Sequence, residues 1–108
     1  PVHDNFKNKI IDSDEVGTWI LNKKSKPCIR ALKSEMTSKI HEDGIMDMTA
    51  LANIKELYFG GDMEAAPALS GQSVGLIDAV KSVDTIIKET INEFNETCLK
   101  LSKEKFDE

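Results

Sequence analysis

The sequence predicts a mainly α-helical unit with one short strand. Apolar residues recur every three or four positions along most of the 108 residues, which is the period of an amphipathic helix. A single run, Thr18-Trp19-Ile20-Leu21, is rich in strand-forming residues. The length allows one domain at most, because compact domains usually hold about 100–150 residues. We therefore expect one small helical unit rather than a multidomain enzyme.

The N-terminal part is expected to hold one helix and the strand. Residues 4–15 carry apolar positions at helical spacing, and Gly17 supplies a stop signal. The strand at residues 18–21 has no obvious partner, and even a two-stranded hairpin is marginal in water. We expect this strand either to pair with backbone outside the 108 residues or not to form.

Two further helices are expected in the middle of the chain. Residues 28–42 carry an apolar stripe that ends at Gly44. Residues 48–59 carry a second stripe, with Asp47 as a candidate N-cap and the pair Gly60 and Gly61 as its stop.

A segment of small residues follows, and a helix is expected to resume near Ala68. Glycine in a helix interior costs about 0.5–1 kcal/mol relative to alanine, so Gly71 and Gly75 indicate that something approaches closely. One explanation is a flat ligand or another backbone. The other is that both glycines let this helix pack tightly on a neighbour. Their spacing leaves both explanations open.

The last expected helix begins after Ser82, a candidate N-cap. Its apolar residues step by four, three, four and three positions, which predicts a narrow stripe along one face: Ile87, Ile91, Phe94, Cys98 and Leu101. The charged end of the chain, residues 102–108, is expected to be frayed.

Composition excludes several classes of function. Lys and Arg total 14 against 19 for Asp and Glu, and a net charge of −5 argues against nucleic acid as a partner. No run approaches the roughly 20 apolar residues of a membrane span. The two histidines, His3 and His41, have no second ligand at a metal-binding spacing, so no metal is expected. We interpret His41 as a favourable partner for helix carbonyls.

The two cysteines are too few for a disulfide scaffold, which indicates a reducing, cytoplasmic compartment. Cys28 lies near Lys26 and Arg30, which would favour a thiolate nucleophile. It has no histidine nearby to act as its base. We therefore interpret both Cys28 and Cys98 as small thiols that face the core.

Two stretches of the sequence resemble those of known proteins. Residues 1–7, together with the block at 61–65 and the run Ser-Gly-Gln-Ser-Val-Gly-Leu-Ile at 70–77, resemble the C-terminal third of the nitronate monooxygenase family. These enzymes are also called 2-nitropropane dioxygenases, and the related flavin-type enoyl-acyl-carrier-protein reductases share the pattern. The Gly-Asp block followed by Ser-Gly-Gln-x-x-Gly-Leu-Ile is the specific part of this resemblance.

The resemblance implies a C-terminal fragment of a flavoprotein with a (β/α)₈ TIM barrel and a small helical domain. Residues 1–16 would then form the last outer helix of the barrel. Residues 17–81 would form the small domain, with a flavin-proximal segment at 62–78, and residues 82–108 the C-terminal amphipathic helix and tail. Because the chain begins with proline rather than methionine, we expect it to be a piece of something longer.

By the same resemblance, Leu69 and Ser70 line the substrate pocket, while Gly71 and Gln72 bind the flavin mononucleotide, FMN. Some family members have a hydroxyl where Leu69 stands, so Leu69 would instead give an apolar wall. No catalytic residue is expected in this chain, because the catalytic base and the phosphate site would lie upstream of Pro1.

Two other positions match the family. Arg30 matches a family arginine, which would anchor the small domain or an anion. His3 matches a stretch on the exterior of the barrel, so we do not expect it to be the catalyst.

We therefore predict part of an FMN-dependent oxidoreductase that oxidises alkyl nitronates, its small-molecule substrates, with oxygen. The chain alone is expected to be inactive. Two alternatives stay open: a flavin-dependent enoyl-acyl-carrier-protein reductase, and a stand-alone helical module. In either case, exposed apolar helix faces favour self-association into a homo-oligomer.

Overall fold

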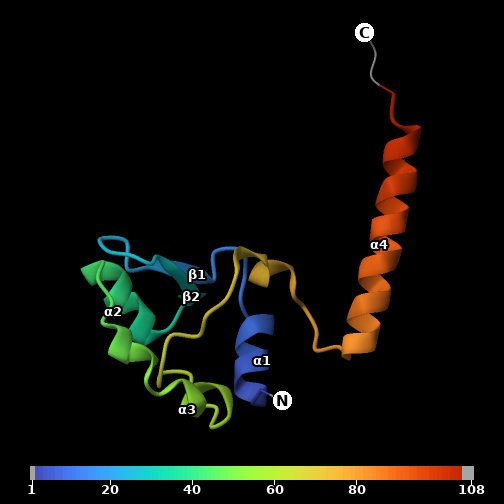
Figure 1. The fold of residues 1–108 in the computed structure, drawn as a ribbon. Helices are drawn as coiled ribbons and strands as arrows, with labels where there is room; N and C mark the ends of the chain where they lie inside the picture. Colours follow the sequence, from blue (N-terminus) through green and yellow to red (C-terminus); the bar gives the residue numbers. More distant parts are fainter. Residues whose placement is uncertain (1, 106–108) are drawn as a thin grey trace.

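The computed structural model describes residues 2–105 and combines helices with a two-stranded antiparallel sheet (Figure 1). Its elements follow in the order α1 (Asp4–Ile11), β1 (Thr18–Leu21), β2 (Ile29–Leu32), α2 (Glu35–Asp43), the 3-10 helix η1 (Met48–Leu51), α3 (Ile54–Tyr58), the 3-10 helix η2 (Gln72–Leu76) and α4 (Val83–Lys103). Residues 2–76 form a compact body, and the linker of residues 77–82 leads to α4, which stands away from it.

Strand β1 finds its partner within the chain. It pairs antiparallel with β2, with Thr18 opposite Leu32 and Leu21 opposite Ile29. The expectation of a single strand whose partner lies outside the 108 residues is therefore wrong. The hairpin is stabilised because each of its faces packs on apolar residues from other elements.

The helix expected over residues 28–42 is correspondingly too long. Residues 29–32 form β2, and α2 begins only at Glu35. The side chains of Ile29 and Ala31 contact one core cluster, whereas Leu32 contacts the other. This alternation is that of a strand. Apolar residues at 29 and 32 fit a helix as well as a strand, so their spacing alone was ambiguous.

Capping residues define both ends of α2. The Ser34 hydroxyl accepts the Thr37 N–H at 3.1 Å, and the Thr37 hydroxyl accepts the Ser34 N–H at 2.8 Å. Together they form a capping box. Gly44 ends the helix with φ of +76°, as its position in the sequence predicted.

Helices expected at two other places are shorter than predicted. The first ends at Ile11 rather than at residue 15, because the Asp14 carboxylate accepts the Val16 N–H and forms a turn. The helix expected over residues 48–59 is divided into η1 and α3. Asp47 does cap η1, since its carboxylate accepts the Thr49 N–H at 3.0 Å.

Two small cores lie on opposite faces of the hairpin. The larger one joins α1, β2, α3, η2 and the segment before η2, through Phe6, Leu32, Leu57, Ala66, Ala68 and Val74. The smaller one lies under α2 and consists of Leu21, Ala31 and Met46. Neither core includes a residue of α4.

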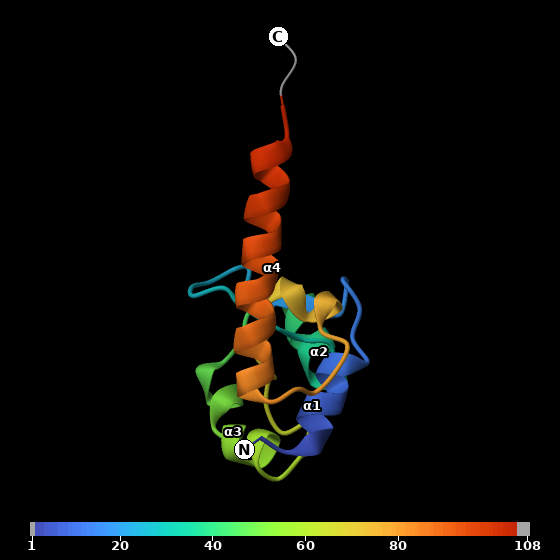
Figure 2. The ribbon, with the colours of Figure 1, turned by 90° about the vertical axis from the view of Figure 1, so that its right-hand side faces the viewer.

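Helix α4 begins where the sequence predicted, with the Ser82 hydroxyl accepting the Thr85 N–H at 3.1 Å. Its apolar stripe is exposed, and Cys98 with it, so the interpretation of Cys98 as a core thiol is wrong. Cys28 is exposed as well. Figure 2 shows α4 extending well beyond the other elements.

The expected frayed tail lies partly outside the described residues, because α4 continues to Lys103 and the description ends at residue 105. Among the described helices, none combines the length and the apolar character needed to cross a lipid bilayer.

Candidate functional site

The four residues expected to form the site lie where the chain leaves the sheet and enters η2. Leu69 pairs with Ala31 through an isolated antiparallel bridge. Two hydrogen bonds flank it: the Leu32 N–H donates to the Ala68 carbonyl at 2.8 Å, and the Ser70 N–H donates to the Arg30 carbonyl at 3.1 Å. The helix expected to resume near Ala68 is therefore wrong, because this backbone is extended and hydrogen-bonded to β2.

These four residues form a ridge that follows a buried segment and is itself largely exposed. The residues that precede it, residues 66–68, are buried in the larger core or against it. Leu69 is 39% exposed, Ser70 is partly exposed, and Gly71 and Gln72 are exposed. The structure thus brings the four expected residues together as one short ridge, defined here as residues 69–72.

The two glycines that the sequence singled out have different roles. A Cβ on Gly75 would lie 2.6 Å from the backbone N and Cα of Glu15. That residue follows α1, so close packing on a neighbouring segment explains Gly75. A Cβ on Gly71 would meet only the Ser73 hydroxyl, at 3.7 Å.

Gly71 therefore has open space beside its backbone. Its φ of −88° is accessible to any residue, so neither packing nor conformation in the described chain requires glycine there. Close approach of a flat ligand, the first explanation, fits Gly71 and does not fit Gly75. The flavin-proximal position that the resemblance implied for Gly71 stays a prediction.

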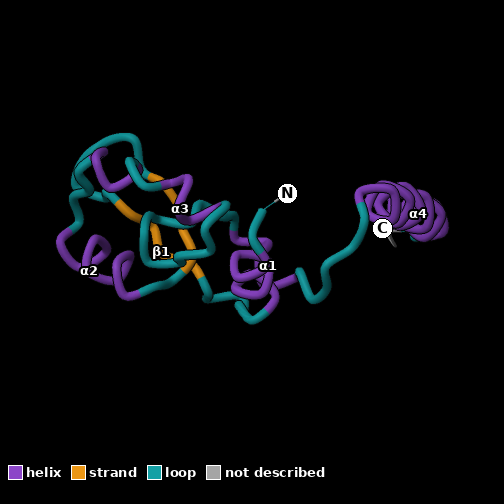
Figure 3. Tube along the Cα trace, turned by 90° about the horizontal axis from the view of Figure 1, so that it is seen from below, coloured by secondary structure: helices purple, strands orange, loops and turns teal. Residues whose placement is uncertain are grey.

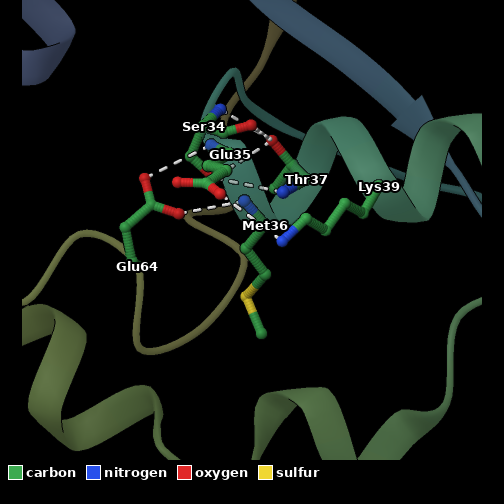
Figure 4. Close-up of polar contacts among 6 residues, drawn as sticks. All are labelled: Ser34, Glu35, Met36, Thr37, Lys39 and Glu64. Carbon is green, nitrogen blue, oxygen red and sulfur yellow. Dashed lines mark hydrogen bonds and ion pairs between the residues drawn. The ribbon is translucent and has the colours of Figure 1, made fainter.

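A carboxylate missed by the sequence analysis anchors the segment that leads to the ridge. The Glu64 carboxylate accepts the Met36 N–H at 2.9 Å and the Glu35 N–H at 3.3 Å, at the start of α2 (Figure 4). It lies where the partial positive charge of the helix favours an anion. Since its partners are 28 and 29 residues away, no local pattern could have revealed it.

The side chains of Arg30 and the two histidines make contacts within the fold. The Arg30 guanidinium donates to the Thr18 hydroxyl at 2.8 Å and so joins β2 to β1, which is a contact within the fold; a role in binding an anion stays a prediction. His3 caps α1, with its Nδ1 accepting the Asn5 N–H at 3.1 Å. His41 stacks on Trp19 with 4.2 Å between ring centroids.

Two titratable groups have pKa values shifted from their ordinary ones. Hydrogen bonds from Thr49 lower the pKa of Asp47, and the ion pair with Glu89 raises the pKa of Lys81. Asp47 caps η1, and Lys81 joins the linker after η2 to Glu89 of α4, so neither group belongs to the ridge. Within residues 2–105, no three His, Cys, Asp or Glu side chains gather as a metal site would require.

A hollow on the surface also lies elsewhere. It has a volume of about 600 Å³ and is lined by residues of α2, η1 and Glu64. None of the ridge residues lines this hollow.

No family model matches the sequence, and no curated protein does. Solved structures do match, including these two. FabK from Thermotoga maritima superposes with a TM-score of 0.84 at 30% identity, over 94% of this chain and 34% of that chain. Its M276A mutant gives a TM-score of 0.77 at 31% identity, over 94% and 31%.

The chain thus spans about a third of the length of the solved structures it matches. FabK is a flavin-dependent enoyl-acyl-carrier-protein reductase with a TIM barrel. The fold described above is therefore shared with one part of a TIM-barrel flavoprotein.

Proposed function

We propose that this chain is part of a flavin-dependent oxidoreductase that reduces enoyl thioesters. The observation that carries the proposal is the similarity to FabK, which extends over 94% of the chain at 30% identity. It favours enoyl reduction over the nitronate oxidation that the sequence first suggested. Because the match covers a third of FabK, the activity needs residues beyond these 108.

In this proposal the ridge forms one wall of the active site. Gly71 lets the backbone come close to the ring of the flavin, taken to be FMN, since no side chain stands between them. The Gln72 amide can both donate and accept a hydrogen bond to polar atoms of the ring. When bound, the flavin supplies the hydride for the reduction.

The substrate side of this wall is apolar. Leu69, with 39% of its surface exposed, gives a contact for an acyl chain and excludes water from it. Ser70 adds one hydroxyl beside it. None of the four ridge residues has a side chain that titrates near neutral pH, so the proton that completes the reduction comes from outside the ridge.

A chimera tests this proposal. The chain replaces the matching third of Thermotoga maritima FabK, and flavin content and nicotinamide-dependent reduction of a crotonyl thioester are measured. We expect the chimera to bind flavin and to reduce the thioester. The 108-residue chain alone should do neither, and turnover by the chain alone would contradict the proposal.

A pair of variants tests the ridge itself. Gly71→Val fills the open side of the backbone and should lower flavin content and turnover, while Ala52→Val adds bulk at an exposed position of the body, away from the ridge. If both chimeras retain full flavin content, the ridge does not contact the cofactor. Oxidation of an alkyl nitronate with oxygen, measured on the same chimera, decides between the two flavin chemistries.

A further inference from the structure

Arg30 is the only arginine in the sequence, and it lies beside the ridge. Its carbonyl accepts the Ser70 N–H at 3.1 Å, next to the bridge that joins Ala31 to Leu69. Figure 3 shows both strands within the body, away from α4. Every other basic residue of the chain is a lysine. Arginine differs from lysine in its planar guanidinium, which binds carboxylate and phosphate oxygens through paired hydrogen bonds.

The register of the sheet directs the side chains of Arg30 and Ser70 to the same face. Arg30 stands opposite Ile20 in the hairpin. On its other side, the bridge at Leu69 continues the antiparallel register, so Ser70 stands opposite Arg30. Residues opposite each other in this way have Cβ atoms about 4.5–5.5 Å apart. Leu69 points to the other face, because side chains alternate along an extended chain, so the ridge has an apolar side and a polar side.

The guanidinium of Arg30 has more donors than the described chain uses. One of its nitrogens donates to the Thr18 hydroxyl at 2.8 Å, whereas a guanidinium carries several N–H donors. The ion pairs found within residues 2–105 all involve lysines, and none involves Arg30. The side chains of Arg30 and Ser70 are both only half-buried. A half-buried charge without a counter-ion favours the binding of an anion.

The segment around Arg30 is positively charged, although the chain as a whole carries a net charge of −5. Residues 16–34 contain no Asp or Glu. They contain these lysines besides Arg30: Lys23, Lys24, Lys26 and Lys33. All of them lie in the hairpin, in its loop or directly after it. A positive segment in an acidic protein attracts anions to one place on its surface.

We propose that Arg30 and Ser70 form a subsite for a phosphate ester on the polar side of the ridge. This inference rests on the proposed function, because that reaction uses two substrates that carry phosphate esters. Thioesters of the coenzyme A type carry one on the pantetheine arm, and nicotinamide dinucleotides carry a pyrophosphate. The guanidinium donates paired hydrogen bonds to the phosphate oxygens, and the Ser70 hydroxyl donates another. The Thr18 hydroxyl holds the guanidinium in this position.

Because the chain has a single arginine, binding can be observed directly. The Nε–Hε group of Arg30 gives one signal in a proton–nitrogen correlation spectrum of the 108-residue chain, and inorganic pyrophosphate is the probe. We expect a saturable shift of this signal that chloride at the same ionic strength does not produce. A shift that does not saturate, or no shift at all, overturns the proposal. This titration uses the wild-type chain, so it stands even where a variant does not fold.

Matched variants test the charge of the subsite by calorimetric titration with pyrophosphate. Arg30→Gln and Lys55→Gln each remove one positive charge, but Lys55 lies on α3, outside residues 16–34. Arg30→Gln should weaken binding about tenfold, as expected for a hydrogen bond to a charged group, and Lys55→Gln should leave it unchanged. Arg30→Lys keeps the charge and should still weaken binding, because lysine lacks the planar fork. Equal losses in Arg30→Gln and Lys55→Gln contradict the subsite.

A second pair of variants tests the hydroxyl. Ser70→Ala should weaken pyrophosphate binding roughly threefold by removing a donor. Ser73→Ala removes an exposed hydroxyl of η2, outside the ridge, and should leave binding unchanged. Wild-type affinity in Ser70→Ala contradicts the placement of the phosphate between Arg30 and Ser70.

The FabK chimera identifies which substrate supplies the phosphate. Arg30→Gln is assayed with crotonyl-coenzyme A and with the crotonyl thioester of N-acetylcysteamine, which has no phosphate. It is also assayed with NADH and with a benzyl dihydronicotinamide, which lacks the pyrophosphate. We expect KM to rise about tenfold for one phosphate-bearing substrate, while KM for its truncated analogue and kcat stay unchanged. Equal effects on a substrate and its analogue overturn the proposal.

Failure of the subsite and failure of the proposed function give different results. A chimera without flavin or turnover refutes the proposed function, and saturable binding of pyrophosphate at Arg30 in the 108-residue chain still supports a phosphate subsite. A chimera that reduces the thioester with KM values insensitive to Arg30→Gln refutes the subsite and leaves the proposed function intact.

Discussion

Replacing Gly75 with alanine should destabilise the fold, whereas the same replacement at Gly71 should not. A Cβ on Gly75 would lie 2.6 Å from Glu15 Cα and N and 2.9 Å from the Asp14 carbonyl carbon. Ordinary contacts begin near 3.4 Å, so the two backbones must move apart by most of an ångström. These are backbone atoms, which cannot rotate away.

The expected loss for Gly75→Ala is about 1–3 kcal/mol, the usual cost of overpacking. At about 4–8 °C per kcal/mol for a domain of this size, the midpoint of thermal unfolding should fall by roughly 5–20 °C. Gly71→Ala has room for its methyl group and an ordinary φ. It should leave stability unchanged or raise it by about 0.4–1 kcal/mol, because alanine restricts the unfolded chain.

Urea unfolding followed by circular dichroism measures both variants against the wild type. Wild-type stability in Gly75→Ala would show that η2 does not pack on the turn after α1 as described. An equal loss in Gly71→Ala would show that the fold itself needs that glycine. Close approach of a ligand would then no longer explain Gly71.

Three further changes test the local structure. Gly61→Ala should cost about 1–2 kcal/mol, because φ is +76° and the new methyl group would meet the His3 ring; an unchanged urea midpoint contradicts this contact. Glu64→Ala should cost about 1 kcal/mol by removing the acceptor for two N–H groups at the start of α2, and hydrogen exchange there should increase. Thr49 lowers the pKa of Asp47 below its usual 3.8, so the stabilisation by this carboxylate is full above pH 3.8 and declines as pH falls further. Asp47→Asn should remove that decline from the acid side of the stability profile, and an unaltered profile argues against the cap.

The site was accessible from the sequence only through resemblance. Leu69, Ser70, Gly71 and Gln72 have no chemistry that composition or spacing identifies, and the structure adds that they form one exposed ridge. Glu64 was missed altogether, because its hydrogen bonds reach across to α2 and leave no local signal.

Local chemistry in the sequence determined where several elements begin and end. Ser82 caps α4, Asp47 caps η1 and Gly44 ends α2, because each acts on backbone groups within a few residues. The amphipathic character of α4 follows from its spacing alone.

The sequence predicted the strand at residues 18–21, but only the tertiary structure decided that residues 29–32 are its partner strand. Residues 29–32 have a spacing that suits a helix or a strand, and pairing with β1 on one side and with the bridge at Leu69 on the other makes them extended. Backbone hydrogen bonds between distant segments have no periodicity in the sequence. These hydrogen bonds form only when the two apolar cores bring the segments together. For that reason the sequence alone predicted neither the pairing of β1 with β2 nor the position of the ridge.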